Sequence, residues 1–319
     1  MKKKVNIYLF SSLLLISFSN IFCQENTRIQ IDSAGFFEKD DIKFTNATIL
    51  TRNNKNKVKI SHDGVDMWCN QAFFYEKKNY IEAYGDVILR QGDTINLNSQ
   101  YLEYDGDTKI AFASGKVKLT EPNSILLTDS LYFNRNKQEA FYNNYGRVIK
   151  EKQDTIDSKI GNYLLENKKY EFKINVVLKN PKYKINTPRL DFYTENGHAY
   201  FYGPTQIKSK ESNIYCELGY YNTNNDTGYF IKESKVDFNN TTILADSIYF
   251  DRNLNFASAS NNIKIIDTIN ENITKGNYAE IFKNKDSMFI TKRAIIASKQ
   301  NNDSLYIHSD TILITGNEQ

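Results

Sequence analysis

Alternating apolar and polar positions dominate the chain, and residues 85–119 show the alternation most plainly. Two runs alternate with period two, the spacing of side chains on one face of a β-strand. Between them, Asp105 to Thr108 form a turn signal, because Asp and Gly tolerate the positive φ of a tight reversal. The stretch predicts a long β-hairpin with one apolar face, formed by Ile95, Leu97, Leu102, Tyr104, Ala111, Ala113, Val117 and Leu119.

The hairpin pattern returns about every 29 residues. Each unit ends its first predicted strand with an aromatic residue or a leucine, namely Tyr75, Tyr104, Phe133, Leu165, Tyr193, Tyr221, Phe250 and Phe282. A polar turn follows each of these positions, and a second polar turn closes the unit. Periods of roughly 20 to 50 residues indicate stacked repeats. We therefore expect strands of about 10 to 12 residues that pair edge to edge.

The predicted fold is all-β. One flat sheet of such strands would expose a whole apolar face, which is unfavourable. We therefore expect the sheet to fold over on itself into an elongated, V-shaped β-jelly-roll with an apolar groove. The expected divisions are a signal peptide at 1–23, an N-terminal cap or degenerate repeat at 24–57, and repeats at 58–319, the last of them incomplete.

Glycine and proline mark expected bends. Gly85 and Gly115 stand in the middle of predicted strands, within an A-x-G-x-V pattern. Glycine weakens a strand interior, so these positions indicate either a bend of the sheet or the close approach of a ligand, and the bend is the simpler interpretation. Pro188 indicates a bulge or bend, whereas Pro204 is expected in or beside a turn.

The N-terminus has the order of a secretory signal peptide. Positive charge at Met1 to Lys4 precedes an apolar run from Val5 to Phe22. We expect export to the periplasm with cleavage near Cys23, and a lipid anchor on Cys23 is the less favoured alternative. Cys69 and Cys216 occupy similar places in repeats far apart along the stack. We therefore expect two half-buried free thiols, although export would permit a disulfide.

Composition and charge narrow the function classes. The chain is 40% hydrophobic and 25% charged, which is typical of a globular protein. Its 22 Tyr and 20 Phe, against four Pro, favour strands. A formal net charge of only +3, with no long basic block, argues against a nucleic-acid partner.

Motifs for catalysis or metal binding are missing from the sequence. His62, His198 and His308 are scattered and show no metal-ligand spacing. His308, Ser309 and Asp310 are neighbours on a predicted strand, where successive side chains point to opposite faces, so they cannot form a triad. Repeated Asp-Thr pairs fit turns and lack the spacing of calcium-binding repeats. We predict a non-enzymatic protein without cofactor or metal; a glycan-cleaving carboxylate pair is a remote alternative.

Residues 85–119 resemble the OstA-like family of lipopolysaccharide-transport proteins, and the resemblance recurs weakly along most of the chain. The matching positions are Gly85, Val87, Gln91, Gly92, Asp93, Leu102, Tyr104, Asp105, Ala111, Ala113, Gly115, Val117 and Leu119. The resemblance implies a periplasmic β-jelly-roll that chains end to end into a bridge, along which lipopolysaccharide moves toward the outer membrane. The family's single-domain bridge proteins are shorter, which leaves open an elongated variant or the front part of a larger protein.

Two candidate sites follow. Inward residues that would line a lipid groove are Ile95, Leu97, Leu102, Tyr104, Ala111, Ala113, Val117, Leu119, Leu131, Phe133, Ile248, Phe250, Ala257, Ala259 and Ile263. The residues alone favour plain core packing, and the resemblance favours the groove. An unpaired edge on the incomplete last unit would place Leu305, Ile307, Ile312 and Ile314 where a partner strand can pair.

The expected function is a periplasmic carrier or bridge for lipopolysaccharide in outer-membrane assembly. Other jelly-roll proteins of the bridge and an outer-membrane assembly protein are the expected partners. The alternative is a structural β-repeat scaffold or adhesin of the envelope that binds protein only.

Overall fold

The computed structural model describes residues 28–39, 44–150, 154–300 and 303–316. The expected signal peptide and Cys23 lie outside the described residues. Apart from two single 3-10 turns, η1 (Glu76–Lys78) and η3 (Lys283–Lys285), the regular elements described are β-strands, which confirms the all-β prediction. The short N-terminal strands are β1 Gln30–Ser33, β2 Phe36–Lys39, β3 Thr48–Thr51, β4 Val58–His62, β5 Val65–Cys69 and β6 Gln71–Tyr75.

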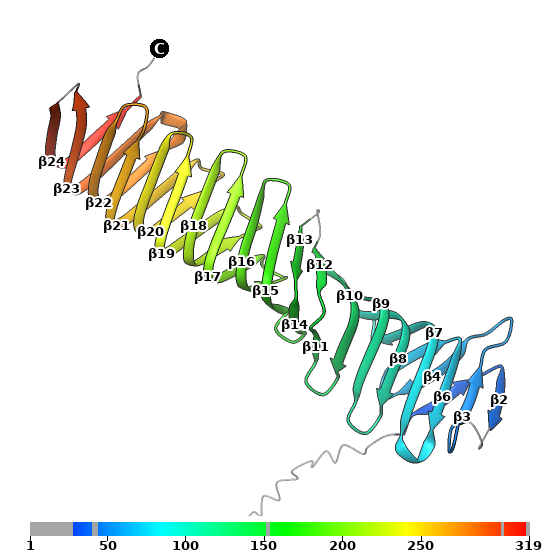
Figure 1. Cartoon of the computed structure of the whole chain (residues 1–319). Helices are drawn as coiled ribbons and strands as arrows, with labels where there is room; N and C mark the ends of the chain where they lie inside the picture. Colours follow the sequence, from blue (N-terminus) through cyan, green and yellow to red (C-terminus); the bar gives the residue numbers. More distant parts are fainter. Residues whose placement is uncertain (1–27, 40–43, 151–153, 301–302, 317–319) are drawn as a thin grey trace, which may run out of the picture.

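Long strands begin at β7 and stack along one axis from the N-terminal to the C-terminal end of the molecule (Figure 1). They are β7 Tyr80–Gln91, β8 Ile95–Asp105, β9 Ile110–Glu121, β10 Ser124–Asn134, β15 Lys169–Asn180, β16 Tyr183–Tyr193, β17 His198–Ser209, β18 Ser212–Asn222, β19 Thr227–Phe238, β20 Thr241–Asp251, β21 Phe256–Asp267, β22 Asn272–Phe282, β23 Ser287–Gln300 and β24 Asp303–Thr315. In the middle, two units are split into β11 Glu139–Tyr142, β12 Gly146–Lys150, β13 Thr155–Ser158 and β14 Ile160–Leu164.

Neighbouring strands pair antiparallel throughout the single described sheet. Two half-sheets, one ending in β5 and the other in β6, both pair with β7 and merge there. From β7 to β24 each long strand pairs with its neighbours in sequence, except where the four short central strands stand in for two long ones. The predicted stack of hairpins is therefore the observed topology.

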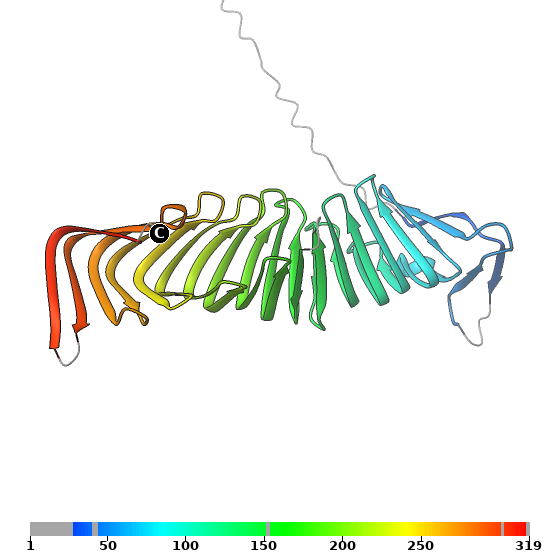
Figure 2. The ribbon, with the colours of Figure 1, turned by 90° about the horizontal axis from the view of Figure 1, so that it is seen from above.

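Each long strand turns a corner near its middle. Every second long strand carries one extra residue at this corner relative to its partner, as between Tyr84 and Val87 in β7. These strands are β7, β9, β15, β17, β19, β21 and β23. Such a bulge bends a strand and increases its twist. Gly85, at φ +75°, and Gly115, at φ +80°, occupy this corner, so the expected bend is confirmed. The C-terminal strands, coloured red, can be followed round the corner in Figure 2.

The positions of Pro188 and Pro204 agree in part with those predicted from the sequence. Pro188 lies in β16 at the corner, where the register shifts between Asn186 and Arg189, so the predicted bulge is present. Pro204 does not lie in or beside a turn as we expected, but in β17 at the same corner, next to Gly203. A Cβ added to Gly203 would come within 2.7 Å of Cγ of Pro188. Both prolines therefore lie in the bulge at one corner, where the ladder register is already interrupted.

The corner divides the sheet into two facing walls. Wall A holds the half of each strand on the side of Tyr80–Tyr84, and wall B holds the half on the side of Val87–Gln91. The turns at the free edge of wall A form lip A, and those at the free edge of wall B form lip B. The result is a V in cross-section, with apolar side chains inside, as predicted.

Lip A is a ladder of hydrogen-bonded turns. Each turn holds one residue of positive φ whose carbonyl oxygen accepts a hydrogen bond from the backbone N–H of the next turn, such as Gly106 N to Asn79 O at 2.8 Å. The accepting residues are Asn79, Lys109, Gln138, Lys168, Gly197, Asp226, Asn255 and Asp286. Side chains of Asp105, Asn196 and Asn222 close their turns by accepting backbone N–H groups two residues on. The repeated Asp and Asn residues are therefore turn chemistry.

Candidate functional site

The interior differs between the two ends of the roll. From β1 to β19, one continuous cluster of buried apolar side chains fills the space between the walls. In the middle it is aromatic: the rings of Tyr163 and Tyr170 stack at 4.0 Å, and Tyr170 and Phe172 stack at 5.3 Å. All three side chains are less than 2% exposed. This part of the roll is close-packed like an ordinary protein core.

Toward the C-terminal end the walls enclose a cavity of about 950 Å³. Its apolar lining comes from both walls. Ile248, Phe250, Ala257, Ile281 and Met288 lie on wall A, and Ile214, Val236, Ile243 and Ile265 lie on wall B. The volume is near the upper end of the range of about 300–1,000 Å³ for small-molecule sites, which are also mostly apolar.

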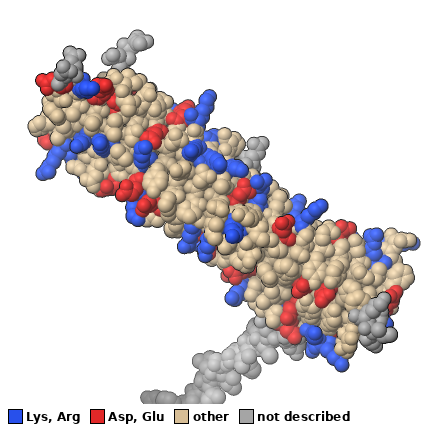
Figure 3. Space-filling view, viewed as in Figure 1, with Lys and Arg blue, Asp and Glu red and all other residues tan. Residues whose placement is uncertain are grey.

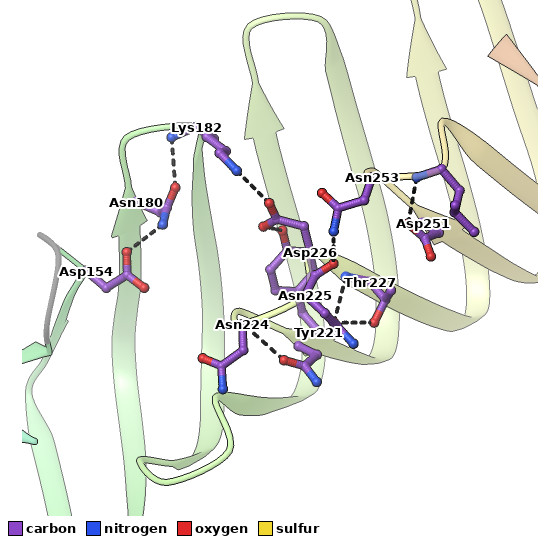
Figure 4. A network of polar contacts seen from close by, with 12 residues as sticks. Asp154, Asn180, Lys182, Tyr221, Asn224, Asn225, Asp226, Thr227, Asp251 and Asn253 are labelled. Carbon is purple, nitrogen blue, oxygen red and sulfur yellow. Dashed lines mark hydrogen bonds and ion pairs between the residues drawn. The ribbon is translucent and has the colours of Figure 1, made fainter. Parts of the chain in front are cut away.

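Ion pairs join the two lips beside and across this cavity. Nζ of Lys182 on lip B lies 2.6 Å from Oδ2 of Asp226 on lip A, and the hydroxyl of Tyr221 donates to Oδ1 of the same carboxylate at 2.9 Å (Figure 4). Farther along, Nζ of Lys283 on lip A lies 2.6 Å from Glu211 on lip B. Both Lys283 and Glu211 line the cavity. The first pair borders the cavity on the N-terminal side, and the second crosses its mouth.

Lip-to-lip contacts also close the filled part. Lys109 pairs with Asp63 at 2.5 Å, and this hydrogen bond holds the pKa of Asp63 below its usual value. Arg135 donates to the backbone carbonyl of Asp63 and to the hydroxyl of Tyr104. These partners lie 31 to 72 residues apart in sequence, so the sequence pattern does not reveal them. Polar contacts between the lips therefore occur over the filled part as well as over the cavity, in addition to the apolar packing inside.

The structure separates the proposed groove residues into two groups. Those from Ile95 to Phe133 lie in the filled interior, where the hydroxyl of Tyr104 is 2.7 Å from Nδ1 of His62. Ile248, Phe250, Ala257 and Ala259 line the cavity. Ile263 lies on wall B next to the corner and is buried in the same C-terminal apolar cluster as Ala259. Further lining residues, such as Ile214, Ile265 and Met288, were missed because the alternation alone does not tell a filled interior from a hollow one.

The proposed edge residues lie on β24. Within the described residues this strand pairs with β23 alone, so its other side carries backbone groups without ladder partners. Leu305 and Ile307 are about half exposed, at 51% and 47%. Ile312 packs against the apolar cluster next to the cavity, and Ile314 lines the cavity itself.

Both described cysteines are free, as predicted, but they are fully buried and not half-buried. Burial raises the pKa of the Cys69 thiol and of the Cys216 thiol to about 12. A protonated, enclosed thiol is a poor nucleophile. Cys69 and Cys216 are therefore packing residues of the core.

Charges of both signs are interspersed over the face of the molecule shown in Figure 3. Among the described residues, no three His, Cys, Asp or Glu side chains gather in a way that could hold a metal ion. The described part of the chain also contains no helix with the length and hydropathy needed to cross a membrane.

The fold and the cavity define a class: an elongated antiparallel β-roll of stacked hairpins with an apolar interior. The profile of the family described as OstA-like protein matches residues 26–188, just over half of the 319 residues. The chain belongs to this family, which confirms the resemblance noted in residues 85–119. A search of curated proteins found no match. The family match ends in β16, but the same repeat geometry continues to β24.

Proposed function

We propose that the protein carries lipopolysaccharide through the periplasm toward the outer membrane and shields its acyl chains in the C-terminal cavity. Membership of the OstA-like family supports a role connected with lipopolysaccharide transport. The observation that carries the proposal is the cavity of about 950 Å³, lined by apolar side chains from both walls. No catalytic role is proposed.

Physical chemistry explains why such a carrier needs a cavity. Burying an acyl chain is worth about 0.8 kcal/mol for each CH₂ group, so a lipid that crosses water must keep its tails covered. The polar groups of the lips, including Lys182, Lys283 and Glu211, can face the water and the lipid headgroup while the tails lie on Ile248 and Phe250. An amphiphile therefore fits a site with an apolar floor and a charged rim.

The filled interior limits where lipid can lie at rest. Side chains such as Leu102, Phe133 and Tyr170 are at most 1% exposed within this close-packed interior, which leaves no room for a tail unless the walls part. We therefore assign the resting lipid site to β18–β24. Movement of lipid along the residues from Ile95 to Phe133 would require the lips to separate at their polar contacts.

Partners are proposed at the free side of β24. A strand with unpaired N–H and C=O groups is a template for another strand, so a second jelly-roll protein of the transport bridge would extend the sheet there. An outer-membrane assembly protein is the proposed final acceptor. The same free strand edge also favours the second candidate function, an envelope scaffold that binds protein only.

Mass spectrometry of lipid that co-purifies with the mature chain from bacterial envelopes tests the proposal. We expect lipopolysaccharide with the wild-type chain and much less with Ala257→Trp, which fills the cavity. Tyr249→Trp, on the outer face of the neighbouring strand, is the matched control and should retain the lipid. Recovery of protein partners but no lipid from all three chains would favour the scaffold and contradict the carrier.

A further inference from the structure

The outer face of wall A carries a hollow that the lipid cavity does not explain. Its volume is about 400 Å³, within the range of small-molecule sites. Five strands, β9, β10, β11, β14 and β15, contribute to it. The lining residues are Ile110, Tyr132, Asn134, Glu139, Phe141, Ile160, Asn162, Glu171 and Lys173.

The hollow lies at the central irregularity of the stack. Here the unit between Phe133 and Leu165 departs from the regular spacing, and two long strands are replaced by β11 to β14. Departures from an otherwise regular β-ladder are concentrated next to functional sites. The coincidence of the irregular unit with the hollow is the first reason to assign it a function.

Tyr142 fixes the floor of the hollow from inside. Its ring is fully buried, and its hydroxyl is 2.7 Å from Oγ of Ser158. A Cβ added to Gly146 or Gly161 would collide with this ring, at 2.5 and 2.3 Å, so only glycine leaves room for it. Neighbours along a strand point to opposite faces. Anchoring Tyr142 inward therefore directs Phe141 outward into the hollow.

The lining combines flat rings with hydrogen-bonding groups. Tyr132 is 47% exposed, and its ring lies 4.8 Å from that of Phe112 and 6.4 Å from that of Phe141. Nδ2 of Asn162 donates to Glu139 at 2.6 Å, while Oδ1 of Asn162 is buried and has no hydrogen-bond partner among the described residues. A buried acceptor without a partner is costly and calls for a ligand or a water molecule.

Backbone pairing decides against an extended peptide as the occupant. Each of the five strands is paired on both sides within the hollow, so no ladder groups remain for an added strand. The occupant must be recognised by side chains alone. It must offer apolar faces to Tyr132 and Phe141. It must also offer hydroxyl groups, which both donate and accept, to the amide of Asn162 and the carboxylates of Glu139 and Glu171.

We propose that this hollow binds a saccharide. A pyranose ring has C–H groups on its faces and hydroxyls at its edge, which is the distribution that the lining matches. The proposal does not depend on the lipid cavity, because the two sites lie on opposite faces of the sheet. Two sources offer this chemistry: the sugar region of a glycolipid and the glycan strands of a cell wall.

Isothermal titration calorimetry of the full mature chain tests the proposal with two probes. One is the delipidated core oligosaccharide of lipopolysaccharide, and the other is a tetrasaccharide of N-acetylglucosamine. We expect saturable binding of at least one probe. Tyr132→Ala should weaken it about tenfold, since an aromatic anchor dominates a small site, and Asn162→Ala should also weaken it. Tyr229→Ala, which removes an exposed ring from β19 on the same face, is the matched control.

The outcomes separate the possibilities. Binding of the core oligosaccharide assigns the site to a glycolipid, binding of the tetrasaccharide assigns it to a cell-wall glycan, and either result supports the proposal when Tyr229→Ala binds normally. No binding of either probe at millimolar concentration overturns it. Equal losses in Tyr132→Ala and Tyr229→Ala would also overturn it. Ala257→Trp should bind saccharide normally even though it loses lipid, which keeps a failure of one site distinct from a failure of the other.

Discussion

Replacing Ala111 or Ala257 by phenylalanine compares the filled and hollow parts of the roll at one repeat position. Ala111 pairs with Phe133 and Tyr104, and Ala257 pairs with Phe250 in the equivalent place on wall A. Ala111 is 1% exposed within the continuous core. Ala257 instead lines the cavity of about 950 Å³. The two alanines therefore have the same backbone setting but different space in front of them.

The expected free-energy changes have opposite signs. Ala111→Phe inserts a benzyl group where the core is already full; overpacking costs about 1–3 kcal/mol, and a group of this size belongs at the upper end, about 3 kcal/mol. Ala257→Phe extends into the cavity, where full burial of a Phe side chain would be worth about 1.5–3 kcal/mol. Because the cavity is open at its mouth, we expect a change between zero and about 1 kcal/mol of stabilisation.

Hydrogen exchange is the appropriate assay, because a stacked repeat opens locally and each region has its own stability. Ala111→Phe should speed amide exchange in β9 and β10 while leaving β20 and β21 unchanged. Ala257→Phe should leave exchange in β20 and β21 unchanged or slower. Equal destabilisation by both substitutions would refute the reasoning, since it would mean that the C-terminal walls are packed as tightly as the rest.

Three further predictions concern single positions. In thermal unfolding, Gly115→Ala should lower the free energy of unfolding by about 1–2 kcal/mol, because the residue has a φ of +80° and the new Cβ would lie 2.9 Å from the side chain of Gln100. Gly92→Ala has open space around its new Cβ and should lower the free energy of unfolding by less than about 1 kcal/mol. Equal losses in the two variants would contradict this prediction. Cys69 and Cys216 should resist thiol reagents near neutral pH until the protein is unfolded in urea, since burial raises the pKa of each to about 12, and rapid labelling of the native chain would contradict the burial. Burial also raises the pKa of Glu121, so the native state holds that proton more tightly than the unfolded state and loses this stability as the pH rises from about 4.5 through the native pKa. Glu121→Gln should therefore stabilise the chain more near pH 7 than near pH 4, and melting curves that show the reverse would disprove this.

Much of the fold could be predicted from the sequence because its signals are local. Alternation at Ile95–Leu97 and turn residues such as Asp105 and Gly106 specify strands and reversals on their own. Gly85 and Gly115 likewise indicate the corner. Other corners carry no such signal: Ile174 and Lys232 adopt a positive φ of 65° and 64° without being glycine. There the bend is imposed by the neighbouring strands of the stack.

The distinction between filled and hollow interior could not be predicted. Ala111, in the run I-A-F-A-S, and Ala257, in the run F-A-S-A-S, stand in similar local sequences of small and apolar residues, and they differ in what the opposite wall presents. The bulky Tyr163 and Tyr170 fill the middle of the roll, whereas the walls that carry Ala257 and Ile265 leave the cavity between them. Lip contacts such as Lys182 with Asp226 join residues 44 positions apart. Packing across two walls depends on their separation, which no single strand encodes.

Photo-crosslinking at Phe250 and Phe133 tests the central claim most directly. The two residues hold the same place in their repeats, but Phe250 lines the cavity and Phe133 is 1% exposed in the filled core. With a photoreactive residue at each position in turn, cells should yield a lipopolysaccharide adduct at Phe250 and none at Phe133. Failure to label lipopolysaccharide at Phe250, or labelling at Phe133 alone, would contradict a lipid site between the C-terminal walls.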